Sequence, residues 1–547
     1  MSSSHESQSE IEAPLEATAA EDPSSPPGEE PQAETSPESD AGSPGNDTSS
    51  GSLVDWMTGQ PGAADESRTA HRWERFMGSE TIGQALSAWL GVDPAEFSQP
   101  SLVRILNRDV AIIDELLSDQ INAIIHAPPF KKLESAWRGL EYLTRVAEEE
   151  GDRERIRIRF LDVSWREVER DLERAVEFDS SELFKKIYEN EFGVAGGKPF
   201  GAMIGNYEIQ PWPGKDHPHR DVDTLKKLSG IAAAAFCPFI AGVSPVMFGL
   251  DEFTGLEGVE NIRGGFSQAE FTEWNAFRQT EDARFVGLAL PRVLMRLPYE
   301  TNDTRADGFC FREEVTGRDR SGYLWGNAAF AFGEVMIRAF AQCGWLAQIR
   351  GVQRNVIGGG LVTGLPVHSF GTDKSGVIPK TSTDTMITDR QESELSNLGF
   401  LPLVHCHDTE FSAFYSSQTV QKPKQYQDSA ATQNAKISSM LQYILCSAQF
   451  AHYLKVLARD KVGTFQEMSD LQMYLHNWIY EYVTPDDKAR AETKASRPLR
   501  SAEVLLREDP AQPGRYMVTF KLWPHYQLDD LVASIRMKTT IEPQGKG

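Results

Sequence analysis

The sequence predicts a large protein with a mixed α/β core. Between residues 160 and 410, amphipathic stretches of helical period alternate with short apolar runs of strand length, and Gly and Pro separate them. This alternation is typical of a sheet covered by helices. With 547 residues, of which 40% are hydrophobic and 10% aromatic, the chain can build a substantial core and is long enough for more than one domain.

The first part of the chain is acidic and poor in large apolar side chains. Residues 1–52 carry 12 acidic residues and no Lys or Arg, within a net charge of −25 for the whole chain. Such a composition cannot offset its ordering entropy by burial, so we expect a disordered tail over residues 1–67. A chain this acidic also lacks the basic footprint that phosphate binding needs, which argues against nucleic acid as a partner.

Four large apolar residues interrupt this tail within five positions: Leu53, Val54, Trp56 and Met57. An apolar island beside a disordered segment is typical of a short helix that docks on a partner protein. The same residues could equally form the first turn of the folded domain, and the sequence leaves both interpretations open.

Residues 68–150 form a predicted helical region. The stretch 71–90 is amphipathic, residues 112–125 repeat apolar side chains at helical spacing, and another helix begins near Phe130. Residues 155–160 then alternate strictly between Arg and apolar residues. That alternation predicts a half-buried strand whose basic outer face is solvated.

The α/β core is expected over residues 151–431. Its helices are predicted at 165–176, 180–190, 224–236 and 328–342, and its strands at 200–207, 239–243, 285–290 and 400–404. The uncharged stretch 228–250 has the length of a membrane span. Its Gly and Pro residues instead divide it into a short Ala-rich helix and a buried strand, so we expect no membrane insertion.

The end of the chain changes from helical to strand patterning. Residues 432–497 are predicted to be helical, and residues 498–547 to hold strands. Apolar residues alternate with polar ones at Val504, Leu506, Tyr516, Val518, Phe520 and Leu522, and again over 531–538. A lone hairpin is marginally stable and has open edges, so we expect these strands to pair with another chain.

A dense cluster of opposite charges lies beside an apolar run between residues 274 and 299. Its members are Arg278, Glu281, Asp282 and Arg284. Adjacent carboxylates on a helix point about 100° apart and do not share a catalytic site. Spacings of three and four residues instead allow Arg–carboxylate pairs along a helix. The pattern therefore favours a structural ion-pair network over an acid/base site.

No motif for catalysis, a cofactor or a metal emerges, and we expect none of the three. His405 and His407 could share a metal, but no companion ligands follow. The glycines at 358–360 lack the phosphate-loop pattern. The five cysteines are widely spaced without a CxxC pair, which fits a reducing compartment and a cytoplasmic protein.

Several long segments, in the same order, resemble the large subunit of the type VI secretion system contractile sheath, the TssC/VipB family. They include FKKLESAWRGLEYL at 130–143, PFGAMIGNYEI at 199–209, FRQTEDARFVGLALPRVLMRLPY at 277–299, YLWGNAAFAFGE at 323–334, TVQKPK at 419–424, AHYLKVLARDKVG at 451–463 and SRPLRSAEV at 496–504. The resemblance covers roughly residues 100–525; the stretch 68–105 and the end from Gln527 onward depart from it.

The resemblance implies a structural, non-enzymatic bacterial protein. Members of this family pair with a small sheath subunit in an obligate heterodimer, and the heterodimers stack as a helical tube around an inner tube and on a baseplate. Contraction of the sheath drives the inner tube into a target cell, and a hexameric AAA+ ATPase then disassembles the sheath.

The same resemblance implies roles for the two ends of the chain. The C-terminal strands would complete small sheets with neighbouring chains, and Leu53 to Met57 would be the helix that the ATPase recognises. Two alternatives stay open at this point: the sheath of a phage-tail-like injection particle, or a soluble α/β enzyme centred on Arg278 to Arg296.

Overall fold

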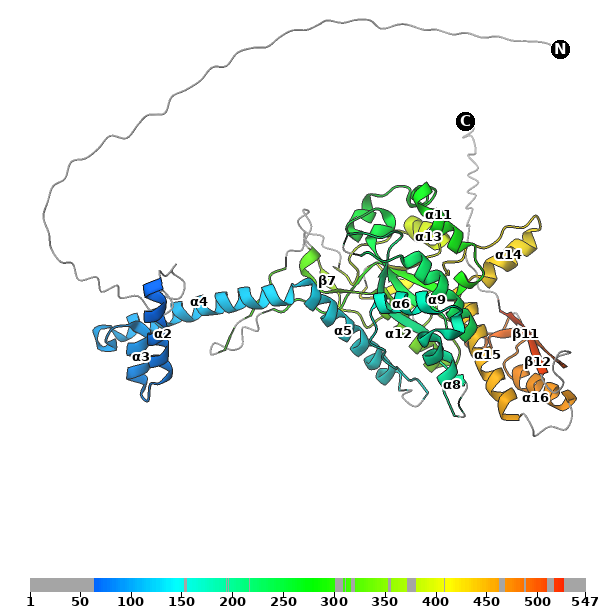
Figure 1. Cartoon of the computed structure of the whole chain (residues 1–547), viewed down its shortest axis with the longest axis horizontal. Helices are drawn as coiled ribbons and strands as arrows, with labels where there is room; N and C mark the ends of the chain where they lie inside the picture. The colour runs from blue at the N-terminus through cyan, green and yellow to red at the C-terminus, as the bar shows by residue number, and fades with distance from the viewer. Residues whose placement is uncertain are drawn as a thin grey trace, which may run out of the picture. The chain divides into compact units, whose positions relative to one another are not determined.

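A computed structural model describes most of the chain (Figure 1). The described residues are 63–151, 155–192, 194, 196–215, 217–300, 308–309, 311–315, 320–352, 356–370, 380–407, 409–461, 468–486, 488–508 and 516–525. The side chains of 63–69, 459–461, 468, 508 and 516–517 are outside the description. The chain divides into two compact units, Met1–Asp109 and Val110–Gly547.

The first unit is built from helices. It contains α2 (Ala63–Met77), α3 (Ile82–Leu90), η1 (Pro94–Glu96) and the start of α4 (Gln99–Ile125). One helix over 71–90 was expected from the amphipathic pattern. The structure has two, because α3 starts anew after its N-cap Thr81, whose side chain accepts from the Gln84 amide. Buried Arg72 joins the two helices by donating to the Trp89 carbonyl at 2.8 Å.

A six-stranded sheet organises the second unit. Its strands are β1 (Met203–Ile209), β2 (Phe239–Val243), β3 (Val286–Leu290), β9 (Leu401–His405), β10 (Ser412–Phe414) and β6 (Leu361–Val362), in that spatial order. The first four strands are parallel, and β10 runs antiparallel to both β9 and β6. The sheet confirms the mixed α/β class, and each of the four core strands predicted from apolar runs lies within three residues of its expected position.

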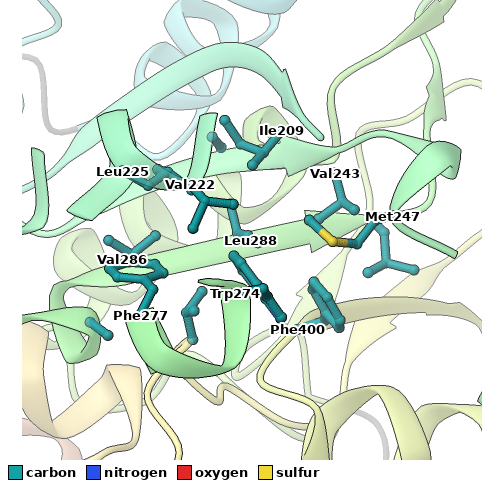
Figure 2. Packing of buried hydrophobic residues seen from close by; sticks show 14 of the residues in the cluster. Ile209, Val222, Leu225, Val243, Met247, Trp274, Phe277, Val286, Leu288 and Phe400 are labelled. Atoms are coloured by element: carbon teal, nitrogen blue, oxygen red, sulfur yellow. The ribbon is translucent and has the colours of Figure 1, made fainter. Parts of the chain in front are cut away.

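Helices cover both faces of this sheet. On one face, Leu225 of α9 (Asp221–Ala235) and Trp274 and Phe277 of α11 (Thr272–Arg278) pack on Leu288 of β3 (Figure 2). On the other face lie α5 (Pro128–Glu149) and α12 (Ala328–Cys343), through residues such as Leu143 and Phe332. The apolar strands are therefore buried on both sides, as parallel sheets require.

The N-terminus of α12 is fixed to the sheet at a glycine. The N-cap Asn327 accepts from the Ala329 amide at 2.8 Å and donates to the Tyr207 carbonyl at 2.9 Å. A Cβ at Gly242 of β2 would lie 2.6 Å from the Asn327 side chain. Only glycine therefore allows this close approach of helix and strand.

A buried ion-pair network joins α12 to α5 and β6. Glu334, fully buried, accepts from the Tyr142 hydroxyl, from Arg338 and from the Thr363 amide at 2.9 Å. Arg338 also donates to Glu150 at 3.1 Å and to the Leu361 carbonyl at 2.5 Å. Every charge in the cluster has partners, the condition under which buried charges are tolerated.

The remaining elements are short helices and small ribbons around this core. They are α6 (Trp165–Arg174), η2 (Phe178–Ser180), α7 (Glu182–Phe184), η3 (Lys185–Glu189), α8 (Asn190–Phe192), η4 (Pro245–Phe248), η5 (Phe253–Gly258), α10 (Ile262–Gly265), η6 (Ala269–Phe271), η7 (Asp282–Phe285), β4 (Val293–Leu294), η8 (Arg320–Gly322), β5 (Trp325–Gly326), β7 (His368–Ser369), β8 (Lys380–Thr381) and α13 (Asp389–Asn397). After the core come α14 (Ser429–Ser438), α15 (Leu441–Lys461), α16 (Met468–Tyr480), α17 (Ala491–Ser496), β11 (Leu499–Glu508) and β12 (Tyr516–Pro524).

One expectation needs correction. Residues 155–160 form no strand: the segment is extended without ladder pairing, and its basic side chains bind locally, Arg159 to Glu191 and Arg155 over the Phe340 ring. Residues 68–150 are divided between the two units, and α5 packs in the core of the second. Within the described residues, no helix has the length and apolarity of a membrane span, which agrees with the division of 228–250 into α9 and β2.

Candidate functional site

The C-terminal strands form a hairpin within the chain. β11 and β12 pair antiparallel over nine residue pairs, from Leu499↔Pro524 to Glu508↔Tyr516, with a bulge between Leu499 and Ser501. In the described part of the chain this sheet has two strands and no third. The hairpin thus has the strands that the alternating pattern predicts, at the expected positions.

The apolar side chains of the hairpin fill the chain's own core. Val504 and Leu506 are buried against Phe450 of α15 and Leu475 of α16. Val518, Phe520 and Leu522 are half-buried on the same cluster. The side chain of Tyr516 is outside the description. The hairpin is therefore seated on helices, and what it can offer to another chain is the hydrogen-bonding edge of its backbone.

Backbone bonds show which edge is occupied. At one end of β11, Leu499 donates to the Tyr482 carbonyl at 3.3 Å and accepts from the Thr484 amide at 2.8 Å. At the other end, the Leu506 amide donates to Gln472 Oε1 at 3.5 Å. The outer edge of β11 is thus partly satisfied by the helical region beside it.

The outer edge of β12 differs from that of β11 in the partners of its backbone groups. The Leu506 amide bonds outside the ladder, so Leu506↔Val518 is a pair whose backbone groups point away from each other. The two-residue period places the amides of Val518, Phe520 and Leu522 on the outer side of β12. Among the described residues, β11 is the sole strand paired with β12, so this edge is the one available for strand addition.

Aromatic packing holds the hairpin's helical support to the core. Trp345, just after α12, stacks on Phe450 with ring centroids 3.9 Å apart, and Tyr482 packs edge-on to Trp345 at 4.8 Å. Such contacts between rings add specific geometry to apolar burial. The hairpin edge is therefore carried on a firmly packed base.

The charged stretch near residue 278 differs from the predicted network. Arg278 ends α11 and is buried, and its guanidinium donates to the carbonyls of Val420 at 3.0 Å and Asn397 at 3.3 Å. Burial lowers the pKa of Arg278 to about 10. Because the helix stops here, the pairings of Arg278 with Glu281 and Asp282 that helical spacing predicts do not form.

Glu281 belongs to an exposed pair instead. It accepts from Lys424 at 3.0 Å and lies 4.0 Å from Arg284, while Asp282 is exposed. The hydrogen bond from Lys424 lowers the pKa of Glu281. The structure thus brings together two of the four named residues, Glu281 and Arg284. Arg278 instead binds two backbone carbonyls.

Sequence reasoning also missed a partly buried charged cluster, where Arg292 donates two hydrogen bonds to Glu208, both at 2.7 Å. Nearby Asp384 is buried, and its Oδ1 has no hydrogen-bond partner. Burial raises the pKa of Asp384 to about 8, although the nearby Arg292 opposes this. The residues lie far apart in sequence, and the polar run TSTDT at 381–385 reads as a surface loop, so no local signal revealed the cluster.

His405 and Cys446 lie in environments that do not favour metal binding or thiol reactivity. In the described ranges, no group of three or more His, Cys, Asp or Glu side chains could hold a metal ion. His405 Nδ1 lies 3.5 Å from Ser412 Oγ, and burial lowers the pKa of that imidazole. Burial raises the pKa of the Cys446 thiol to about 12, so that thiol stays protonated near neutral pH. The apolar island at Leu53, Val54, Trp56 and Met57 lies outside the described residues.

Comparison with known proteins identifies relatives over most of the chain. Residues 107–421 match the EvpB/VC_A0108 tail sheath N-terminal domain family, and residues 430–541 match the EvpB/VC_A0108 tail sheath gpW/gp25-like domain family. A type VI secretion system sheath protein of Pseudomonas aeruginosa, TssC1, is 40% identical over 438 residues, which cover 80% of this chain and 85% of that protein.

Solved structures show a more distant similarity. The baseplate of the anti-feeding prophage contains a chain with 10% identity and a TM-score of 0.33, over 58% of this chain and 66% of that chain. The contracted helical sheath of the same particle has 10% identity and a TM-score of 0.26, over 58% and 67% of the two chains.

Proposed function

The chain belongs to the EvpB/VC_A0108 tail sheath family, whose members are structural subunits of the type VI secretion contractile sheath and not enzymes, and we propose on this premise how it assembles. The proposed assembly is a heterodimer with a small sheath subunit, stacked helically around an inner tube in the cytoplasm. The single observation that carries the proposal is the outer edge of β12, a strand edge seated on a rigid base.

Strand addition explains how such an edge could link subunits. Each hydrogen bond between backbone groups contributes about 0.5–1.5 kcal/mol net. The outward amides of Val518, Phe520 and Leu522 could therefore add a few kcal/mol per neighbour without any change in the hairpin's side-chain packing. Bonds of this kind can keep neighbours connected while rigid bodies rotate during contraction.

A proline scan tests the edge directly. Val518→Pro removes one outward amide and leaves the ladder bonds to β11 intact, because Val518 does not bond across the hairpin. Val518→Ala removes similar side-chain contacts and keeps the amide, which makes it the matched control. Tubules should form when Val518→Ala is co-expressed with the small subunit and should be lost with Val518→Pro, as seen by electron microscopy. Normal tubules from a well-folded Val518→Pro protein would argue against pairing at this edge.

The heterodimer itself needs a separate test. Co-expression of the unmodified chain with the neighbouring small-subunit gene should give a stable complex on size exclusion and cogwheel-like tubules in micrographs. Persistent absence of both, with each protein folded, would remove the heterodimer from the proposal. Tubules with a phage-tail-like arrangement and no small subunit would point to the injection-particle alternative.

Disassembly is proposed to start at the apolar island. Leu53, Val54, Trp56 and Met57 stand next to an acidic segment, the setting of a short docking helix for an AAA+ ATPase. Trp56→Asp with Met57→Asp should leave tubule growth unchanged and slow ATPase-driven disassembly, measured by light scattering. If the tubules disappear, the residues belong to the fold; if disassembly keeps its rate, the ATPase binds elsewhere.

A cytoplasmic location fits the thiol chemistry. The described cysteines Cys237, Cys343, Cys406 and Cys446 are all free, as expected in a reducing compartment. Fractionation of cells expressing the chain at native level should recover it with soluble cytoplasmic markers. Recovery in the periplasm would contradict this part of the proposal.

A further inference from the structure

Residues 156–162 are an extended segment whose backbone has no partner within the described part of the chain. Among the described residues, none of their amides or carbonyls takes part in a hydrogen bond. No residue between 156 and 162 is buried, and Phe160 is 64% exposed. The donors and acceptors of seven consecutive residues are therefore open to solvent, as they are along the free edge of a sheet.

Side chains hold this segment in its extended form. Arg159 pairs with Glu191, and Ile158 packs against the apolar cluster between the sheet and its α5 and α12 face. At the end of the segment, the Tyr207 hydroxyl donates to the Val163 carbonyl at 2.7 Å. A sequence with the alternation of a strand is thus kept extended, although no described strand lies in a ladder with it.

An exposed apolar ridge lies next to the segment. On α5, Phe130, Leu133 and Trp137 follow one another at spacings of three and four residues, and all three side chains are exposed. The Trp137 ring lies 5.8 Å from the ring of Phe160, and Leu161 is exposed as well. Exposed apolar side chains that gather in one place mark a surface for another protein. The ridge therefore adds apolar contacts to the free backbone groups beside it.

The chemistry of this surface selects an extended strand as its occupant. Main-chain donors and acceptors that alternate along seven residues are best matched by the backbone of another strand. Arg157 is exposed and has no ion-pair partner within the described ranges, so an acidic residue opposite it would be favoured. Apolar residues on the other face of the incoming strand would cover Phe160 and Trp137.

Other open segments of this chain fit the surface poorly. Residues 1–52 are acidic, but their only large apolar residues are Met1, Ile11 and Leu15, too few to cover the ridge. In a second copy, β12 offers Lys521 and no carboxylate between residues 516 and 524, so it lacks the charge that Arg157 favours. A different protein chain is therefore the better occupant.

We propose that residues 156–162 are a docking strand, to which the small sheath subunit adds an extended strand with apolar residues on one face and an acidic residue opposite Arg157. This inference rests on the proposed heterodimer and names a surface that forms it. The alternation of Arg and apolar residues over 155–160 then has its ladder in the complex and not within the chain.

Hydrogen exchange tests the docking strand directly. In the free chain, the amides of residues 156–162 should exchange at the rate of unprotected backbone. In the complex with the small subunit, taken from the soluble fraction after tubules have been pelleted, alternate amides should exchange at least about tenfold more slowly. Residues 176–181, which surround exposed Phe178, serve as the control and should exchange equally in both samples.

Proline variants separate backbone pairing from side-chain contact. Arg157 and Asp162 are both exposed, and amides at an odd and an even position point to opposite edges of a strand. At least one of Arg157→Pro and Asp162→Pro should lower the amount that co-purifies with a tagged small subunit about fivefold or more, because one acceptor of the partner is left unpaired. Arg157→Ala and Asp162→Ala keep the amides and should each have a smaller effect than proline at the same position.

A variant of the ridge gives an independent measurement. Trp137→Lys should lower co-purification about fivefold or more, because it places a charge in the apolar contact. Phe178→Lys makes the same change at another exposed aromatic side chain and should leave co-purification unchanged. Both positions are exposed, so these variants remain informative even if a proline variant does not fold.

Three results would overturn the docking strand. A complex in which residues 156–162 exchange as fast as in the free chain would show that they stay unpaired. Full co-purification of both folded proline variants would show that no amide of the segment is needed. Protection that appears only in tubules would assign the segment to a neighbouring copy of the chain. In each of these cases the heterodimer still forms, whereas failure of the heterodimer proposal would appear as the absence of any complex with the unmodified chain.

Discussion

Replacing Arg338 by methionine should show how strongly the core depends on one buried ion pair. Arg338 and Glu334 lie four residues apart on α12, and their relative exposures are 4% and 0%. The substitution keeps an unbranched apolar side chain in place of the aliphatic part of the arginine. It removes the charge that balances Glu334 and leaves the Leu361 carbonyl without its guanidinium donor.

The expected cost follows from burial. Breaking a buried pair by removal of one partner costs about 3–5 kcal/mol, because an uncompensated charge is left inside the protein. An exposed pair at the same spacing is worth only about 0.3–0.5 kcal/mol. Arg390 and Glu394 of α13 form such a pair at 3.1 Å, with the arginine 72% exposed. Arg390→Met is therefore the matched control.

Urea denaturation followed by tryptophan fluorescence can compare the variants. Arg338→Met should lower the free energy of unfolding by about 3–5 kcal/mol and Arg390→Met by less than about 1 kcal/mol. Adding Glu334→Gln to Arg338→Met should recover about 1–2 kcal/mol, since no charge is then left buried. A loss below about 1 kcal/mol in Arg338→Met would refute the reasoning, because it would mean that water screens Glu334 in the native state.

Two further predictions concern the sheet. The pKa of Asp384 is raised from 3.8 to about 8 in the fold, so the folded state holds this proton more tightly than the unfolded chain, and stability falls as the pH rises from about 4 through 8. Asp384→Asn should remove that fall, measured as the difference between the melting temperatures at pH 6 and pH 8.5. An unchanged difference would contradict the prediction. Gly242→Ala should cost about 1–3 kcal/mol through its clash with Asn327, whereas Gly230→Ala, which meets no atom within 4 Å, should be neutral or stabilising in the same melting assay; equal effects would refute the clash.

The positions of helices and strands were predicted best where their burial follows from their own residues. The strand at Phe239–Val243 was found at its expected residues, because a continuous apolar run that lies between Pro238 and Pro245 is a local signal. The helix Ala328–Cys343 was found to within one residue, since Asn327 caps its start and Gly344 ends it.

Prediction failed where the structure of a segment depends on a partner that is distant in sequence. Residues 155–160 alternate like a strand, but no neighbouring strand pairs with them. Arg278 sits at helical spacing from Glu281, but α11 ends at Arg278 and the guanidinium turns to carbonyls of Asn397 and Val420. The hairpin itself was predicted, whereas the seating of its apolar face on α15 and α16 required the tertiary structure.

The position of α12 has a mechanical consequence. Its first turn is bonded to the central sheet through Asn327, and the residue just past its end, Trp345, is stacked in the cluster beneath the hairpin. Sixteen residues at about 1.5 Å each make a rod of roughly 24 Å between these two attachments. A helix resists compression along its axis far better than a loop does. A load applied at the hairpin would therefore move the central sheet with it, and little of the hairpin's displacement would be lost between the two.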